Sequence, residues 1–557
     1  MHPDFRVAAG PGLIPRSLLA VTAAWTALVL GVTAGLVPVA GMPVMIAFVA
    51  LPLSAWGLLL RADPPPGIGW IAAWTALVLG AILVVPFLVS SPAVALAPLA
   101  LILSAAICTR LPATAVMVVF TISAIYGSLN AFTGTTGGVA VDLVLAGAWF
   151  GLLVPQLAPD RQRPHLTWPG IVIVGLYLAI TLLGILLSAN PSVGFVVFRL
   201  SAWYLMALLL LAYAGWPAET YSRIARGIVL VAGLVGAYAA FRWVAGPAHE
   251  ELLHALGNPF NFIDGEMRVI GSLPSGHELG FWAGSLAPLS LAALLGWRGG
   301  WRLVAGGSYA LLAFAVLVSE ARGPFVGLVL GSGVVLGLYQ VAGSMPRIRV
   351  GIGVLITAAC IASLTGALIY STNGEDSAIE RYSNILEPSE DGAFARREQK
   401  WGEAIDEIDT HPFGHGLGAA SLIESLRPYE SIGGAGLDNA YLKLAYEQGF
   451  PVVILFITGF LLLLVRLGFG AMRSRSRDTA TAAMGSAGVL TSCLLILYTG
   501  VYIEALVAVG VWIAVGLGVA VVLREESAAV GALGPRPVPE PSRRPVPRLA
   551  PPVQQPG

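Results

Sequence analysis

Long apolar segments recur along most of the chain, separated by short polar connections. A helix needs about 20 apolar residues to cross the hydrocarbon core of a bilayer. Segments of this kind lie near residues 17–37, 41–60, 69–90, 92–108, 113–133, 138–158, 168–188, 193–214, 222–245, 278–296, 301–318, 324–342, 349–371, 441–465, 479–501 and 503–523. Since only helices and closed barrels satisfy the backbone inside a bilayer, the pattern predicts an all-α polytopic membrane protein. We expect about 16 transmembrane helices, with an error of about two.

The composition agrees with this class. Of the 557 residues, 57% are hydrophobic and 11% are charged, and the mean hydropathy is +0.81. A soluble domain could not bury so much apolar surface, so soluble fold classes are excluded. The formal net charge is zero and no basic block occurs, so no nucleic-acid partner is expected. Three cysteines lie inside apolar segments without zinc-binding spacing, and we expect no metal ion and no cofactor.

Arginines fall in every second short connection between the apolar segments. They are Arg61, Arg110, Arg161, Arg163, Arg223, Arg226, Arg298, Arg302, Arg347, Arg349, Arg473, Arg475 and Arg477. Cytoplasmic loops of membrane proteins carry an excess of basic residues, so these connections are predicted to be cytoplasmic. The alternation continues from end to end and places both termini in the cytoplasm.

Two connections are much longer than the others, residues 246–277 and residues 372–440. The arginine pattern predicts that both lie on the extracytoplasmic side. The second contains apolar side chains at helical spacing: Phe394, Trp401, Ile405 and Ile408. This spacing predicts an amphipathic helix on the outer membrane surface, ended by His411-Pro412.

These features divide the chain into five parts. Residues 1–160 and 161–371 hold the N-terminal and central membrane helices, and the central part includes the outer loop 246–277. Residues 372–440 form a large extracytoplasmic loop, and residues 441–523 hold the C-terminal membrane helices. Residues 524–557 are rich in proline and arginine, which predicts a disordered cytoplasmic tail.

Several arginines lie at the outer ends of helices or in outer connections, where the charge rule disfavours them. They are Arg199, Arg268, Arg322, Arg396 and Arg397. A guanidinium group binds phosphate oxygens bidentately and keeps its charge, so such a group of arginines suits a diphosphate anchored in lipid. The alternative for any one of them is a helix-end arginine whose side chain reaches the lipid headgroups.

Four stretches resemble, in order, motifs of the O-antigen ligase and polymerase family, the bacterial membrane glycosyltransferases with a Wzy-type C-terminal region. "RVIGSLPSGHELGFWAG" carries Arg268 and Gly271, and "SEARGPFVG" carries Ser319, Arg322 and Gly323. "RREQKWGEAIDEIDTHPFGHGLG" carries Arg396 or Arg397, Trp401, Pro412, Gly416 and Gly418. "DNAYLKLAYEQGF" carries Asn439, Glu447 and Gly449. Ala321 departs from the family pattern, and the resemblance spans roughly residues 185 to 465.

The resemblance implies a metal-independent, inverting glycosyl transfer. A glycan would leave a polyprenyl-diphosphate carrier and join a hydroxyl of an acceptor sugar, while the arginines hold the diphosphate. The implied partners are a polyprenyl-diphosphate-linked oligosaccharide, a glycan acceptor and the lipid bilayer. Polysaccharide-assembly proteins that dock on the C-terminal tail are a further expected class of partner.

Three residues are candidates for the base that accepts the acceptor proton: Asp438, His415 and His411. Ligases of the family carry histidine before the asparagine of the closing motif, where this chain has Asp438. The alternative role for Asp438 is the N-cap of the next span. For the two histidines the alternative is a structural role beside a glycine-rich turn. Ser319, Asn439 and Glu447 are expected to support the site, although Glu447 can also pair with Lys443 four residues away; His277 and Glu278 are weaker candidates.

The sequence therefore predicts a multi-pass glycosyltransferase of the cytoplasmic (inner) membrane, with its active site on the extracytoplasmic face. Polymerisation of cell-surface polysaccharide repeat units is the favoured activity. A glycan ligase is the alternative within the same chemistry. A lipid-linked glycan transporter or flippase, and a structural assembly factor, are alternatives outside it. The charged residues gather on one outer face rather than at mid-membrane, which favours an enzyme over a transporter.

Overall fold

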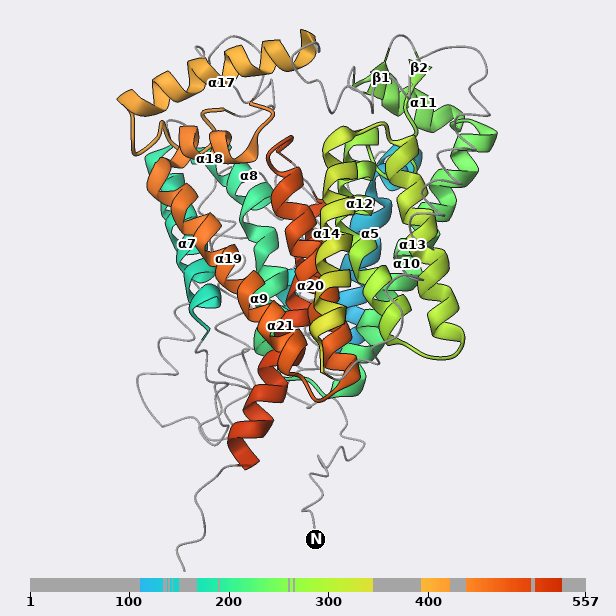
Figure 1. The fold of residues 1–557 in the computed structure, drawn as a ribbon. Helices are drawn as coiled ribbons and strands as arrows, with labels where there is room; N and C mark the ends of the chain where they lie inside the picture. The colour runs from blue at the N-terminus through green and yellow to red at the C-terminus, as the bar shows by residue number, and fades with distance from the viewer. Residues whose placement is uncertain are drawn as a thin grey trace, which may run out of the picture.

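The computed structural model describes residues 111–133, 138, 141–142, 144–149, 168–188, 191–258, 261–263, 266–343, 392–420, 437–501 and 506–532. Within these ranges the protein is a helical bundle (Figure 1). Apart from one pair of two-residue strands, all the regular elements of the described ranges are helices.

Ten helical segments of the described part are long and apolar enough to cross a membrane. They are α5 (Pro112–Thr133), α7 (Pro169–Leu187), the broken segment α8 (Pro191–Ser201), η1 (Trp203–Leu205) and α9 (Met206–Ala214), then α10 (Ala218–Ala245), α12 (Gly276–Gly296), α13 (Gly300–Val318), α14 (Arg322–Val341), α19 (Phe450–Arg473), α20 (Arg477–Ile496) and α21 (Ala508–Ala532). The protein is thus a multi-pass membrane protein. The remaining predicted spans fall wholly or mostly outside the described residues.

The core lies where α12, α20 and α21 pack together. Small residues allow these helices to approach closely, as they do in other membrane proteins. Ser492 of α20 donates a hydrogen bond of 2.6 Å to the backbone oxygen of Gly327 in α14. Ser486 donates another, also 2.6 Å, to the oxygen of Ala514 in α21. Hydroxyl groups inside the bundle therefore find backbone acceptors on neighbouring helices.

The described elements outside the ten membrane-length segments lie at one end of the bundle, the upper end in Figure 1. They are α11 (His249–Leu256), β1 (Phe262–Ile263), β2 (Glu266–Met267), α17 (Gly392–Thr410) and α18 (Ala440–Gln448). β1 and β2 pair antiparallel, with Phe262 opposite Met267. The described parts of the two long loops therefore lie above the same end of the helices.

Two boundaries differ from the sequence prediction. The span expected near 441–465 is divided at Gly449, which adopts a φ of +88° between α18 and α19. Pro451 follows in the first turn of α19 and has no N–H to continue the preceding helix. At the C-terminal side, α21 continues to Ala532, so helix extends into the segment predicted as a disordered tail from residue 524. Residues 533–557 lie outside the described part.

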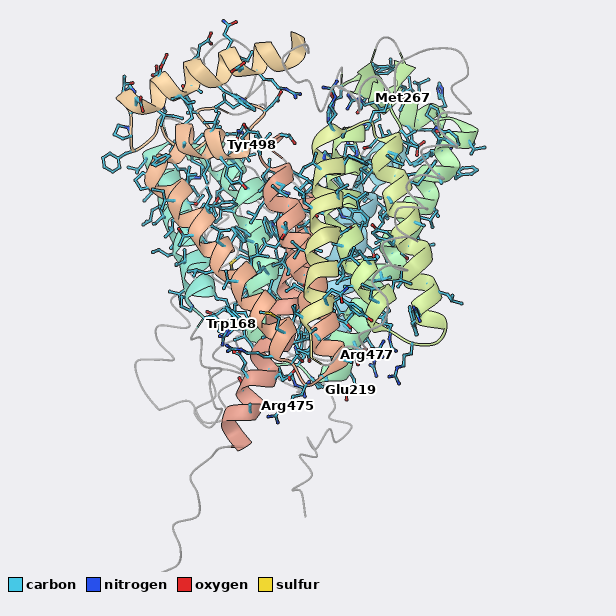
Figure 2. All side chains as sticks on the ribbon, in the orientation of Figure 1. Trp168, Glu219, Met267, Arg475, Arg477 and Tyr498 are labelled. Carbon is cyan, nitrogen blue, oxygen red and sulfur yellow. The ribbon has the colours of Figure 1, made fainter. Side chains whose placement is uncertain are left out.

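Ion pairs and hydrogen bonds hold the end of α21 in a helix. Glu526 pairs with Arg466 at 2.6 Å and accepts a hydrogen bond from the Trp168 indole at 3.0 Å. Glu525 accepts a hydrogen bond of 2.6 Å from Ser474. These contacts join α21 to α7 and α19 at the lower end of the bundle, where Trp168 and Arg475 are also found (Figure 2).

Candidate functional site

The described parts of both long loops carry polar side chains and lie at the upper end of the bundle (Figure 2). The first loop leads into α12, whose N-cap Ser275 accepts a hydrogen bond from the backbone of Glu278 at 3.1 Å. This cap fixes the start of the helix and places His277 in its first turn. Arg268 Nη1 lies 2.9 Å from His277 Nε2. Arg268 and His277, both sequence candidates, are thus direct neighbours.

The second loop brings another guanidinium group to the same place. His277 lies within electrostatic range of both Arg268 and Arg397, although more than one hundred residues separate these arginines in the sequence. Arg397 belongs to α17, which lies across the top of the bundle (Figure 1). Two positive charges from separate loops therefore gather beside the N-terminus of α12, an end that itself favours anions.

Arg397 also pairs with Asp438, one of the candidate bases. Its Nε lies 3.2 Å from Asp438 Oδ2, and both side chains are about two-fifths exposed, 42% and 41%. Asn439, and not Asp438, is the N-cap of α18. Its Oδ1 accepts hydrogen bonds from the backbone of Tyr441 at 3.0 Å and of Leu442 at 3.2 Å. The alternative role of Asp438 as helix cap is therefore wrong, and its carboxylate remains accessible beside an arginine.

The turn before α14 lies beside the same end of α12. Ser319 is fully buried and donates a hydrogen bond of 2.7 Å to the backbone oxygen of Val316. Glu320 follows with a φ of +52°, a left-handed conformation that is costly for a residue other than glycine. Arg322 is the first residue of α14. A Cβ on Gly280 of α12 would come within 2.7 Å of Ser319 Oγ, so only glycine allows this close approach.

A continuous series of contacts joins this turn to the Arg397–Asp438 pair. A side chain at Gly323 would overlap Thr499, at the end of the chain segment that follows α20. In the same segment, Leu497 accepts a backbone hydrogen bond of 3.0 Å from Ala440, and Tyr498 packs on Trp401 with ring centroids 5.4 Å apart. Arg322 and Ser319 therefore belong to the same end of the molecule as Arg268, Arg397 and Asp438.

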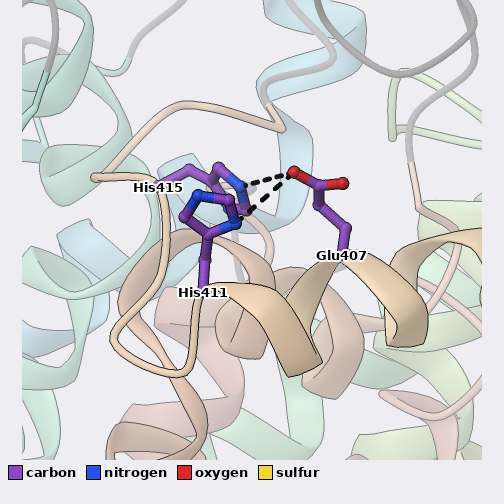
Figure 3. Close-up of side chains that lie close together, drawn as sticks. All are labelled: Glu407, His411 and His415. Atoms are coloured by element: carbon purple, nitrogen blue, oxygen red, sulfur yellow. Dashed lines mark hydrogen bonds and ion pairs between the residues drawn. The ribbon is translucent and has the colours of Figure 1, made fainter.

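A second cluster lies at the opposite end of α17 and contains Glu407, His411 and His415 (Figure 3). Glu407 Oε1 lies 3.1 Å from His415 Nε2 and 3.5 Å from His411 Nδ1. His411 follows Arg397 by 14 residues, about 20 Å along the axis of a helix. The histidine candidates are therefore remote from the arginine cluster. Sequence reasoning missed Glu407, although its spacing of four residues from His411 places both on one helical face.

The loop that carries His415 is fastened to α18 and the start of α19. His415 and Gly416 donate backbone hydrogen bonds of 2.9 Å to the oxygens of Tyr446 and Glu447. Phe450 donates one of 3.1 Å to the oxygen of Pro412. Gly414 has a φ of +79°, and a Cβ there would lie 2.6 Å from the backbone of Glu447. The glycines of this stretch thus serve a tight backbone contact.

Glu447 has a structural environment. It is 2% exposed, its Oε1 lies 3.8 Å from Lys443 Nζ, and this same oxygen accepts a hydrogen bond of 3.1 Å from the backbone of Ala420. The predicted pair between Lys443 and Glu447 is confirmed. Tyr446 stacks on the His415 ring at a centroid distance of 4.3 Å. Burial and the charges of Glu407 and Glu447 raise the pKa of Tyr446, so its hydroxyl stays protonated at neutral pH.

The other sequence candidates lie outside both clusters or form contacts of their own. Arg199 forms an ion pair with Asp142 among the membrane helices, a partner that sequence reasoning also missed. Arg396 belongs to α17, but its side chain is outside the described part. Glu278 accepts a hydrogen bond of 3.0 Å from the hydroxyl of Tyr126.

Comparison with known proteins gives one family. A family model described as O-antigen ligase matches residues 307–457, which run from α13 through the upper-end turn, α17 and α18 into α19. No curated protein matches the chain. The match covers Arg322, Arg397, Asp438 and both histidines, in the same order as the motifs of the sequence. This match supports an assignment to the O-antigen ligase/polymerase family of membrane enzymes of polysaccharide biosynthesis.

Proposed function

We propose that this protein transfers a glycan from a polyprenyl-diphosphate carrier to a hydroxyl of an acceptor sugar, and that it polymerises repeat units of a cell-surface polysaccharide. The observation that carries the proposal is the Arg397–Asp438 ion pair at the upper end of the bundle, where Arg397 is within electrostatic range of His277 and Arg268 contacts His277. Two guanidinium groups and a carboxylate, drawn from separate loops, supply the groups that such a transfer needs.

The arginines would stabilise the leaving diphosphate. Negative charge develops on the diphosphate as the glycosidic bond breaks, and fixed positive groups near that charge lower the barrier. Arg397 donates through Nε to Asp438, which leaves the other guanidinium nitrogens for phosphate oxygens. Arg268 contacts His277, which is within electrostatic range of Arg397, and would bind the second phosphate. Guanidinium groups thus take the role that a divalent cation has in many phosphate sites, and the proposed transfer uses no metal ion there.

Asp438 is the base that this geometry favours. A general base must lie within hydrogen-bond reach of the proton that it accepts. Asp438 is held next to Arg397, whereas the nine-residue helix α18, about 13 Å long, separates it from the His415 loop. The acceptor hydroxyl would approach the anomeric carbon from the face opposite the diphosphate, which inverts the configuration at that carbon. Asp438 would take its proton as the new bond forms.

The proposed site faces the extracytoplasmic side of the membrane. Arg475 and Arg477 lie at the lower end of the bundle, opposite Tyr498 (Figure 2). Arg477 donates a hydrogen bond of 3.2 Å to Leu295 at the lower end of α12, and Arg226 lies over the Trp301 ring at 5.4 Å. The basic connections of the described part thus share one end, which the positive-inside rule assigns to the cytoplasm. The arginine cluster at the other end would meet a lipid carrier in the outer leaflet.

A reconstituted assay tests the proposal. Purified full-length protein is given a polyprenyl-diphosphate oligosaccharide, and glycan length is followed by gel electrophoresis and mass spectrometry. Arg397→Gln should slow elongation by about 100- to 1000-fold, and Asp438→Asn by about 100- to 10,000-fold. Arg397→Lys should recover only part of the rate, because lysine keeps the charge but loses the planar fork.

Two matched controls separate chemistry from folding. Glu403→Gln changes an exposed acid on α17, and Arg475→Gln changes an arginine at the lower end; both should leave the rate unchanged. Full activity in Asp438→Asn would reject Asp438 as the base. Full activity in Asp438→Asn and Arg397→Gln together would reject the proposed site. A labelled lipid-linked glycan that crosses the bilayer without forming a new bond would instead indicate a flippase.

A ligase is the second candidate, because the matching family model is described as O-antigen ligase. Polymerase and ligase differ in the acceptor. A polymerase joins two lipid-linked repeat units, whereas a ligase moves a finished glycan to a different molecule. Asp438-Asn439, in place of the histidine-asparagine pair of ligases, favours the polymerase. Supplying only lipid-linked repeat units distinguishes the two, since a ligase would form no longer chains from them.

A further inference from the structure

The cluster at the end of α17 has no role in the proposed transfer, and its atoms have the arrangement of a metal site. Figure 3 shows Glu407 on the last turns of α17, His411 directly after that helix, and His415 on the following loop, with all three side chains converging. One ligand atom from each residue lies within 4.8 Å of the others. We propose that Glu407, His411 and His415 bind one divalent transition-metal ion, with Zn²⁺ as the best fit.

The distances match those between ligands of a tetrahedral zinc ion. With metal–ligand bonds near 2.1 Å, two ligand atoms of such a site lie about 3.4 Å apart. Glu407 Oε1 lies 3.1 Å from His415 Nε2 and 3.5 Å from His411 Nδ1. The ligand atoms of the remaining pair, His411 and His415, lie within 4.8 Å of each other. Three protein ligands leave a fourth position for water or another oxygen.

The hydrogen bonds of His415 favour a cation between the rings and the carboxylate. His415 Nδ1 lies 3.1 Å from the backbone oxygen of Tyr446, which can only accept, so Nδ1 carries the proton. In the neutral ring, Nε2 then presents a lone pair to Glu407 Oε1 at 3.1 Å. Two acceptors facing each other repel unless a cation or a proton lies between them. A ring whose second nitrogen donates to a carbonyl is the usual form of a metal-bound histidine.

His411 has one competing partner. Its Nδ1 lies 2.8 Å from Thr410 Oγ1, while Thr410 Oγ1 also lies 2.9 Å from the backbone oxygen of Glu407. The threonine has one hydroxyl proton, and when this proton goes to the Glu407 oxygen the His411 nitrogen is available to the metal. The rings of His411 and His415 lie close together, with centroids 4.4 Å apart, so both face the same carboxylate oxygen.

The protein holds these ligands in place without the metal. Backbone hydrogen bonds fasten the loop of His415 to Tyr446 and Glu447, as described above. The C-terminal end of α17 carries the partial negative charge of the helix dipole, which favours a cation beside His411. Asp406 and Asp409, both exposed on the last turns, add negative charge nearby.

The ligand set selects the class of metal. Two imidazoles and one carboxylate suit Zn²⁺ and similar transition metals, whereas Mg²⁺ and Ca²⁺ prefer oxygen ligands alone. The bound ion would fasten the end of α17 to the α18–α19 turn and occupy both histidines. It lies remote from Arg397 and Asp438, so this proposal does not depend on the transfer reaction.

Metal binding is measured directly on the full-length protein, purified in detergent through a tag without histidines. Bound metal is first removed with a chelator and dialysis. Zn²⁺ binding is then measured by isothermal titration calorimetry, and the metal content per chain by inductively coupled plasma mass spectrometry. We expect one Zn²⁺ per chain. Mutation of a residue that hydrogen-bonds to a metal ligand typically weakens metal binding by roughly 10- to 100-fold, and loss of a ligand itself should weaken it more. We therefore expect the Zn²⁺ affinity to fall by at least about 100-fold in each of the variants His411→Ala, His415→Ala and Glu407→Gln.

Matched controls are available on the same helix and the same end of the molecule. Glu403→Gln, one turn before Glu407 on α17, and His249→Ala, exposed on α11, should bind Zn²⁺ as the unchanged protein does. Substitution with Co²⁺ gives a readout that needs no variant, because tetrahedral ligation by two imidazoles and a carboxylate produces intense visible absorption. Absence of stoichiometric Zn²⁺ in the unchanged protein would overturn the proposal. Unweakened binding in His411→Ala and His415→Ala would overturn it as well.

Discussion

At the scale of single residues, neighbouring polar side chains in residues 437–450 have different structural roles that the sequence did not distinguish. Asp438 and Asn439 are adjacent and both residue types cap helices, yet only Asn439 caps α18. Asp438 instead faces Arg397 from a distant part of the chain. Glu447 matches a family motif, but it is buried against Lys443 and the backbone of Ala420. Local sequence identifies polar residues of interest, and their partners decide what each one does.

The Lys443–Glu447 pair provides a prediction at this scale. Lys443→Met should destabilise the protein by about 3 to 5 kcal/mol, because Glu447 would remain buried without the charge of its partner. In the double variant Lys443→Met with Glu447→Gln, the neutral amide oxygen can still accept from Ala420, so most of the loss should be recovered. Thermal unfolding in detergent measures both.

The comparison of the two variants makes this prediction specific. Equal unfolding temperatures in the single and the double variant would show that the loss comes from packing rather than from an uncompensated charge. Lys400→Met serves as the control, because it removes the other lysine of the chain from the less buried helix α17 and should shift the unfolding temperature little.

At the scale of elements, α17 is the connection between the two clusters. Its spacing predicted an amphipathic helix that ends before His411-Pro412, and the structure has a helix that ends at Thr410. The buried side includes Ala404 and Ile408, with Trp401 packed on Tyr498. Ile405 is 47% exposed within the protein, so it is not part of this buried side, and its predicted place on the outer membrane surface stays a prediction. The segment that follows α20 contacts Trp401 and sets the rotation of α17 about its axis.

Loss of the contact with Tyr498 should loosen α17. Trp401→Ala should increase cleavage of this segment by added protease and slow glycan elongation, because Arg397 lies one turn away on the same helix. Trp401→Phe should keep most of the contact and most of the rate. Limited proteolysis and the elongation assay test this together. Ile405→Ala, a change at an exposed position, should affect neither, and equal effects of Trp401→Ala and Ile405→Ala would contradict the proposed anchor.

At the scale of the whole molecule, the proposed transfer depends on which side of the membrane each end faces. The upper end holds α11, α17 and α18, and the lower end holds Arg475, Arg477 and the end of α21 (Figures 1 and 2). A lipid carrier in the outer leaflet can reach the arginine cluster only if the upper end is extracytoplasmic.

Cysteine labelling in intact cells measures this orientation. In a background with Cys108, Cys360 and Cys493 replaced, a cysteine at Glu403 should react with a membrane-impermeant maleimide added outside. A cysteine at Arg475 should react only after the membrane is opened. The reverse result would place the site in the cytoplasm and reject the transfer proposed here. Both positions are exposed, so lack of reaction is not caused by burial.

The sequence by itself determined the class of protein and the list of candidate groups. Apolar segments of membrane length predict helices because a bilayer leaves the backbone no other way to satisfy its hydrogen bonds. The order of the motifs also indicated the family whose model matches residues 307–457. These properties depend on short stretches of the chain, so they can be predicted without knowing which distant segments are in contact.

Only the tertiary structure decided which candidates meet. Arg268, Arg397 and Asp438 come from different parts of the chain and converge because α17 crosses the end of the bundle. Arg199 carries the same guanidinium group, but it forms an ion pair with Asp142. Glu407 becomes significant only when the loop after His411 folds back and brings His415 to it. Charge and hydrogen bonding act over a few ångströms, so the packing of remote segments determines the chemistry available to each side chain.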